Sequence, residues 1–157
     1  MCKLAIPVIL LYYNQAMGEV MGIVYAEIIL KNTKDIYNAE DGIIKESEIR
    51  QAAVRAMVDT GAGSLVINEE MRAKLGLAVR GLRRATFAND AKEVCKVTDP
   101  VTIYWNNRYT ATPALVIPAS NEVLLGAIPL EDMDLIVDPA RQMLTGAHGD
   151  EIVCLVK

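Results

Sequence analysis

The residue best placed to do chemistry in this sequence is Asp59, which lies between two apolar runs at residues 52–58 and 65–67. A carboxylate buried between such runs costs free energy unless it is paired or hydrogen-bonded. A hydroxyl residue, a glycine and a small residue follow it: Thr60, Gly61 and Ala62. These residue types let the backbone turn tightly and donate hydrogen bonds to a carboxylate. Asp59 is therefore expected either to do acid–base chemistry or to cap the backbone of a structural turn.

Hydrolysis of a peptide bond by carboxylates needs two of them. One is ionised and takes a proton from water, while the other is protonated and donates to the carbonyl oxygen. Two carboxylates about 3 Å apart cannot both ionise, so they share one proton and titrate as a unit. A single Asp59 is therefore only half of such a site.

The sequence contains one Asp-Thr-Gly and no Asp-Ser-Gly. The tripeptide that starts at Asp138 continues with Pro139 and Ala140, and a proline has no backbone N–H to donate to a carboxylate. A second carboxylate would have to be Asp59 of another copy, because an isologous dimer brings the same residue of two chains to one axis. If Asp59 is catalytic, the sequence predicts a homodimer with C2 symmetry.

A second motif lies downstream, where residues 124–127 read Leu-Leu-Gly-Ala. With both motifs in this order, the chain resembles the retropepsin-like aspartic proteases (clan AA), in particular their small prokaryotic single-domain members. The resemblance extends from about Met21 to Val156, and two ordered motifs are more specific than Asp-Thr-Gly alone. It implies a mostly β, closed-barrel-like acid protease (retropepsin) fold with two short helices. It also implies an aspartic endopeptidase that uses no metal and no cofactor.

The resemblance assigns a role to each residue of the two motifs. Asp59 is the catalytic residue, Thr60 is expected to hydrogen-bond across the dimer, and the N–H of Gly61 is expected to face the carboxylate. The shared proton of such a dyad is an established property of aspartic proteases. The second motif is expected to pack beneath the active-site loop through Leu124, Leu125 and Gly126.

In this family a hairpin called the flap closes over the substrate, and residues 86–94 fit that position. The predicted tip contains no glycine, unlike the flap tips of retroviral relatives, and consists of Ala88, Asn89 and Asp90. The alternative for this tip is an ordinary turn that faces the solvent.

The local patterns agree with a mostly β chain. Helix signals are few: Asn68 as an N-cap and Gly76 as a stop predict a helix over 69–75, and Pro129 predicts one over 129–133. Residues 32–50 are polar and are expected to form a surface connection with at most one helical turn. Strands are predicted at residues 24–30, 52–58, 64–67, 83–87, 92–97, 101–105, 109–117, 123–125, 135–137, 142–144 and 152–156.

The amino-acid composition limits the kinds of binding partner and the cellular compartment that are expected for this protein. The 157 residues are 52% apolar, which suffices for one domain with a core. The net charge of −4 gives no electrostatic footprint for nucleic acid. Three cysteines without a CxxC spacing favour reduced thiols and a cytoplasmic location. The single histidine, His148, lies in a predicted turn and makes a zinc site unlikely to form.

The apolar run at residues 4–13 is too short for a transmembrane helix and lacks a clear signal cleavage site. Stable membrane association is therefore not expected. Residues 1–20 are interpreted as a dispensable N-terminal extension, and residues 21–157 as the protease domain.

Two functions remain open from the sequence. The first is an endopeptidase that acts on an extended polypeptide laid across the two-fold axis, with dimer formation required for activity. The second is a non-catalytic dimeric module on the same fold that binds peptides or proteins. Retention of the whole Asp-Thr-Gly favours the first, because a binding module has no use for a costly buried carboxylate pair.

Overall fold

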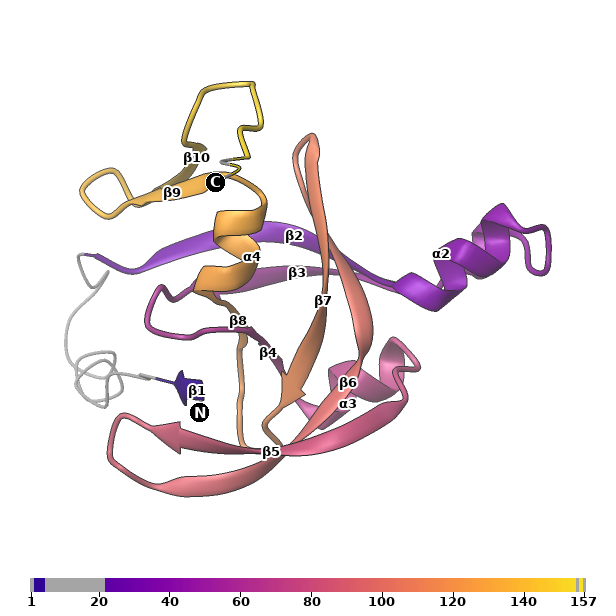
Figure 1. The fold of residues 1–157 in the computed structure, drawn as a ribbon, viewed down its shortest axis with the longest axis horizontal. Helices are drawn as coiled ribbons and strands as arrows, with labels where there is room; N and C mark the ends of the chain where they lie inside the picture. Colours follow the sequence, from indigo (N-terminus) through magenta and orange to yellow (C-terminus); the bar gives the residue numbers. More distant parts are fainter. Residues whose placement is uncertain (1, 5–21, 155, 157) are drawn as a thin grey trace.

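The computed structural model describes residues 2–4, 22–154 and 156, and in this part of the chain most of the secondary structure is strand (Figure 1). The mostly β fold predicted from the sequence is thereby confirmed. In chain order the elements are β1 (Cys2–Leu4), β2 (Val24–Asn32), α2 (Thr33–Glu40), the 3-10 helix η1 (Glu46–Glu48), β3 (Gln51–Val58), β4 (Leu65–Ile67), α3 (Glu69–Lys74), β5 (Val79–Phe87), β6 (Lys92–Trp105), β7 (Arg108–Val116), β8 (Val123–Leu125), α4 (Ala127–Asp132), β9 (Leu135–Asp138) and β10 (Met143–Gly146).

The large sheet closes on itself. Its strand order is β1-β5-β6-β2-β3-β8-β4-β7, and β6 pairs with β7 as well as with β2 and β5. Six strands, from β6 through β2, β3, β8 and β4 to β7, therefore form a closed barrel, which removes most free sheet edges. A second, two-stranded antiparallel sheet consists of β9 and β10.

The barrel interior holds the main hydrophobic core. Alternate residues of β2 point inward, so Ile28 and Leu30 are fully buried while Ile29 is 43% exposed. The same cluster receives Leu130 and Met133 from the α4 region and Leu135 and Leu144 from the two-stranded sheet. The C-terminal elements therefore dock on the barrel by apolar contacts.

Helix α3 forms as the sequence predicts. The side chain of Asn68 accepts a hydrogen bond from the N–H of Met71 at 2.8 Å, which makes it the N-cap. Gly76 ends the helix with a φ of +61°, a left-handed conformation that glycine adopts without strain. Helix α4 begins at Ala127, two residues before the predicted start, because Gly126 is its N-cap.

The connection at residues 32–50 is more structured than predicted. It contains the eight-residue helix α2, which projects from the barrel at one end of the molecule (Figure 1). The helix is capped by Asn32 and fixed at its base by Asp35, whose carboxylate binds the guanidinium of Arg50 at 2.7 and 2.8 Å. This ion pair joins residues 15 positions apart in the sequence, so no short-range pattern predicts it.

The strand predictions differ from the structure in three places. The strand predicted at 83–87 begins four residues earlier, at Val79. Residues 92–105 form one strand rather than two, because an irregularity between Val97 and Pro100 lets the strand continue opposite Pro113. The predicted strand at 152–156 is absent from the described residues 152–154 and 156. There the N–H of Val153 donates to the carboxylate of Asp134 at 3.2 Å instead of to a strand partner.

Most of the predicted N-terminal extension, residues 1–20, lies outside the described residues. Its described part is β1, which pairs in parallel with the end of β5. Whether the extension is dispensable stays a prediction. Among the described residues, the longest apolar helices fall short of what a membrane crossing requires.

Candidate active site

Asp59 lies immediately after β3, the strand between β2 and β8 in the barrel wall. Its backbone N–H donates to the carbonyl of Leu125 at 3.0 Å, and its own carbonyl accepts from the N–H of Ala62 at 3.1 Å. The chain therefore leaves the barrel wall in a tight turn at Asp59. Ala62 is fully buried, whereas Thr60 and Gly61 are exposed at the outer end of the turn.

The two carboxylate oxygens of Asp59 have different surroundings. Oδ1 accepts a hydrogen bond from the N–H of Gly61 at 2.9 Å. Oδ2 is buried and has no hydrogen-bond partner among the described residues. Burial raises the pKa of Asp59 above its usual range, and hydrogen bonds from the backbone of Gly61 and Ala62 oppose that shift. One oxygen of the carboxylate is therefore held by the loop backbone, and burial of the group disfavours its charged form.

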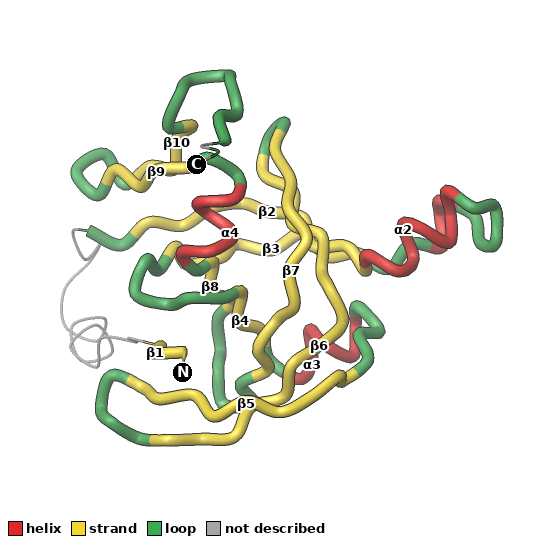
Figure 2. Tube along the Cα trace, in the orientation of Figure 1, coloured by secondary structure: helices red, strands yellow, loops and turns green. Residues whose placement is uncertain are grey.

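The second motif lies directly against the Asp59 loop. β8 runs parallel to β3, with Leu124 beside Met57 and Leu125 beside Val58. After Gly126 the chain turns into α4, whose first N–H groups donate to the loop: Ala127 to Ala62 at 2.7 Å and Ile128 to Gly63 at 3.1 Å. Figure 2 shows the loop after β3 beside the start of α4. The structure therefore brings the two predicted motifs together.

Gly126 sits where no side chain fits. A Cβ atom there would lie 2.4 Å from the carbonyl oxygen of Ser64 and 2.7 Å from that of Ala62. The φ of Gly126 is −86°, which any residue can adopt. The glycine is required by this close approach and not by its backbone conformation.

A cavity of about 330 Å³ opens beside Asp59. Its lining is mostly apolar and includes Met57 and Val58 from β3, and Gly22 and Ile23 just before β2. Thr60 also lines it, and Val137 and Pro139, from β9 and the turn after it, complete the lining. Val137 and Pro139 were not predicted from the sequence as site residues. They follow Asp59 by 78 and 80 positions, so only the tertiary fold brings them to it, and the Asp138-Pro139 turn is the one local feature that marks this segment.

The predicted flap is a hairpin of β5 and β6. At its tip the N–H of Phe87 donates to the carbonyl of Ala91, and Asp90 adopts a left-handed φ of +61°, which glycine would otherwise provide. Ala88, Asn89 and Asp90 do not line the cavity at Asp59. The structure therefore forms the hairpin but does not bring its tip to the carboxylate.

The part of that hairpin next to its tip packs near the Asp59 loop. Ala85 and Cys95, both 1% exposed, pack in one cluster with Ala62 and Leu124. Cys95 thus behaves as the small buried apolar residue expected from its place in a strand. Phe87, at the start of the tip turn, packs against the same cluster, so the hairpin contacts the surroundings of the Asp59 loop although its tip residues do not line the cavity.

His148 lies in a turn, as predicted, and its Nδ1 contacts both carboxylate oxygens of Asp134 at 2.9 and 3.0 Å. The hydrogen bond from His148 is the main reason that the pKa of Asp134 is lowered. Neither residue lines the cavity at Asp59.

Comparisons with known proteins agree with the motif positions. The sequence model of a family described as aspartyl protease matches residues 46–128, more than half of the chain, and the matched stretch contains both motifs. No curated protein matches the sequence. A crystal structure of a retropepsin-like aspartic protease from Rickettsia conorii matches at 16% identity and a TM-score of 0.37, covering 76% of this chain and 90% of that one.

Proposed function

Because the chain belongs to the aspartyl protease family, we propose that it is an endopeptidase that hydrolyses peptide bonds with a water molecule activated by Asp59. The observation that carries the proposal is that the two carboxylate oxygens of Asp59 have different surroundings. One is fixed by the Gly61 N–H, and the other is buried without a partner among the described residues. An unpaired buried oxygen is costly for a structural turn, and a proton on this carboxyl group would lower that cost.

The second carboxylate of the reaction is proposed to be Asp59 of another copy. The support is the single Asp-Thr-Gly of the sequence together with the exposure of Thr60 and Gly61 at the outer end of the turn. A C2 contact at this end would place two Asp59 side chains about one axis and bury the two exposed residues. The dimer would then be the active unit.

The substrate is proposed to be an extended polypeptide, and the supporting feature is the mostly apolar cavity beside Asp59. An extended chain can pair with exposed strand edges and place alternate side chains in such a cavity. A cytoplasmic location is part of the proposal, supported by the unpaired thiols of Cys95 and Cys154.

The test uses the Asp59→Asn protein and a library of peptides, with cleavage followed by mass spectrometry from acidic to neutral pH. Asparagine keeps the size of the side chain but cannot accept a proton from water, so cleavage should fall to background. The variant Asn38→Ala, within helix α2 at the other end of the molecule, is the control and should cleave like the wild type. Cleavage by Asp59→Asn at the wild-type rate would contradict the proposal.

Mixing the two proteins tests the dimer separately. When one part of wild type exchanges subunits with three parts of Asp59→Asn, about one quarter of the wild-type chains should pair with each other. Activity per wild-type chain should fall to about that fraction if each site needs two Asp59 residues. Unchanged activity would mean that one chain is sufficient. Peptide binding without products at any pH would instead identify a non-catalytic binding module.

A further inference from the structure

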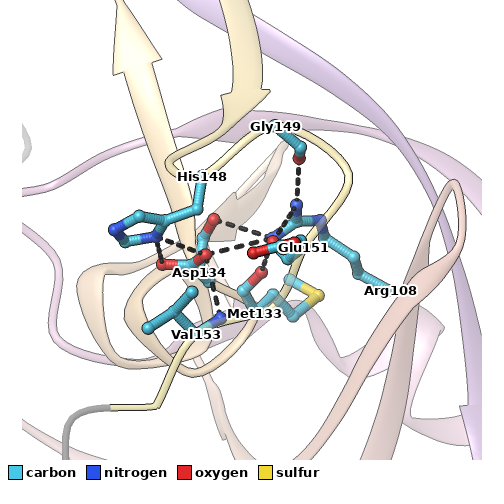
Figure 3. A network of polar contacts seen from close by, with 7 residues as sticks. All are labelled: Arg108, Met133, Asp134, His148, Gly149, Glu151 and Val153. Carbon is cyan, nitrogen blue, oxygen red and sulfur yellow. Dashed lines mark hydrogen bonds and ion pairs between the residues drawn. The ribbon is translucent and has the colours of Figure 1, made fainter.

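Arg108, the first residue of β7, is buried to 98% of its surface, and its guanidinium donates to four backbone carbonyls (Figure 3). Nη1 contacts the carbonyls of Met133 and Asp134 at 2.8 and 2.9 Å, and Nη2 contacts those of Gly149 and Glu151 at 2.5 and 3.0 Å. A buried guanidinium is strongly destabilising unless hydrogen bonds satisfy it. Here the hydrogen bonds of the guanidinium go to backbone carbonyls within one segment, residues 133–151.

The four carbonyls flank the two-stranded sheet on both sides. Met133 and Asp134 immediately precede β9, and Gly149 and Glu151 follow β10. In the described residues β9 pairs only with β10 and not with a strand of the barrel. Arg108 therefore joins the two ends of this hairpin to each other and to β7.

Asp134 adds a second set of contacts in the same place. Its carboxylate accepts from the N–H of Val153 and contacts Nδ1 of His148, and it lies 3.6 Å from Nη1 of Arg108. Its carbonyl also accepts from the N–H of Ala147 at 2.9 Å. A Cβ on Gly146 would lie 2.3 Å from Nη2 of Arg108, so the segment fits closely around the guanidinium.

The hairpin held in this way provides one wall of the cavity at Asp59, through Val137 and Pro139. Leu135 and Leu144 bury the hairpin in the barrel core, so apolar contacts dock it without Arg108. Apolar contacts are not directional, whereas four hydrogen bonds from one rigid guanidinium fix where both ends of the hairpin lie.

We propose that Arg108 is a positioning residue for the Asp59 site. It sets how far Val137 and Pro139 reach into the cavity and thereby determines the size of substrate side chain that fits beside the scissile bond. This inference rests on the proposed peptidase function. The side chain has to be arginine, because the three N–H groups of a lysine ammonium cannot reach four carbonyls in this planar arrangement.

The test compares Arg108→Lys with the wild type on peptides that differ only in one residue next to the scissile bond, which is alanine, leucine or phenylalanine. In Arg108→Lys the ratio of kcat/KM between the phenylalanine and alanine peptides should change by about tenfold, through KM, because pocket contacts of one or two methylene groups carry discrimination of that size. Asp134→Asn keeps the four carbonyl contacts of Arg108 and should change the ratio less, in the same direction. It is also the variant to measure if Arg108→Lys does not fold.

The matched control is Asp35→Asn, which weakens the ion pair between the buried Asp35 and the half-exposed Arg50, at the base of α2 and away from the cavity. It should lower stability but leave the ratio of the two peptides within about twofold of the wild type. The proposal is overturned if Arg108→Lys lowers kcat equally for all three peptides, as a loss of folded protein would.

Amide hydrogen exchange separates this inference from the proposed function. In Arg108→Lys the amides of β9 and β10 should exchange at least about tenfold faster than in the wild type, while those of β2 and β3 stay unchanged. If the wild type cleaves none of the peptides, the proposed function fails, and exchange decides alone whether Arg108 positions the wall. Unchanged exchange at Val137 would overturn the inference even in an active enzyme.

Discussion

Replacing Gly126 with alanine should disrupt the Asp59 loop by a steric contact that can be located to three atoms. The added Cβ would lie 2.4 Å from the carbonyl oxygen of Ser64, and 2.7 Å from both the Ser64 nitrogen and the Ala62 oxygen. Real Cβ atoms essentially never come closer than 3.0 Å, and these three are backbone atoms that cannot rotate away. The loop or the start of α4 must therefore move.

The cost follows from what such a movement breaks. Overpacking a tight site costs about 1–3 kcal/mol, and separating the loop from α4 weakens the two hydrogen bonds from Ala127 and Ile128, at about 0.5–1.5 kcal/mol each. The free energy of unfolding should fall by about 2–6 kcal/mol, which at about 2–4 °C per kcal/mol for a domain of this size corresponds to roughly 4–24 °C in Tm. Since the loop carries Asp59, a displacement of about 1 Å should also lower kcat about 100-fold.

Thermal unfolding and peptide cleavage measure the two effects, with Gly81→Ala as the matched control. A Cβ on Gly81 meets nothing within 4 Å, so the control should keep the Tm within about 2 °C of the wild type and should cleave normally. The reasoning would be refuted if Gly126→Ala unfolded and cleaved like Gly81→Ala, because the loop would then yield without cost.

Two further predictions concern Asp59 and α3. A raised pKa in the folded state means that the native protein holds the Asp59 proton more tightly than the unfolded chain, so stability is lost as the pH rises through that pKa. Asp59→Asn should therefore be more stable than the wild type at pH 7, by about 1 kcal/mol because the group is only half-buried, and should lose this advantage at about pH 3. Denaturant unfolding at both pH values measures the difference in stability. A difference that persists at acidic pH would count against burial of the carboxylate as its cause. Asn68→Ala should remove the N-cap of α3 and lower stability by about 1 kcal/mol, with unchanged peptide cleavage. The control Glu70→Ala, at an exposed position of the same helix, should change stability by less than about 0.5 kcal/mol. Equal unfolding midpoints for the two variants would contradict the capping argument.

The sequence predicted best what short-range chemistry decides. Asn68 and Gly76 define α3 because a cap and a left-handed glycine act within one turn of the helix. The loop at Asp59 could be predicted from the sequence for the same reason, because its carboxylate accepts hydrogen bonds from the nearby backbone of Gly61 and Ala62. The division of residues 92–105 into two predicted strands was wrong, because the register shift between Val97 and Pro100 does not end the pairing with β7.

What the sequence could not predict depends on contacts between distant residues. The strand expected at 152–156 was wrong because Asp134, 19 positions earlier, takes the N–H of Val153. Helix α2 was underestimated because Arg50 completes its anchor from beyond the helix. Val137 has no local sign of a role at the site, and neither has Arg108, which as a lone arginine after two asparagines looks like an ordinary turn residue.

The Asp59 site therefore has two supports that come from separate parts of the chain. Its floor is the turn at Gly126, which hydrogen-bonds the loop and determines whether the carboxylate is presented at all. Its wall is the β9–β10 hairpin, whose ends are fixed by Arg108. No hydrogen bond described above is shared between the two. Because contacts without common partners act nearly independently, the floor can stay fixed while changes at the wall alter which side chains fit beside Asp59. Under the proposed peptidase function, such a division of roles would let one carboxylate loop serve different polypeptide sequences without a change in the residues that do the chemistry.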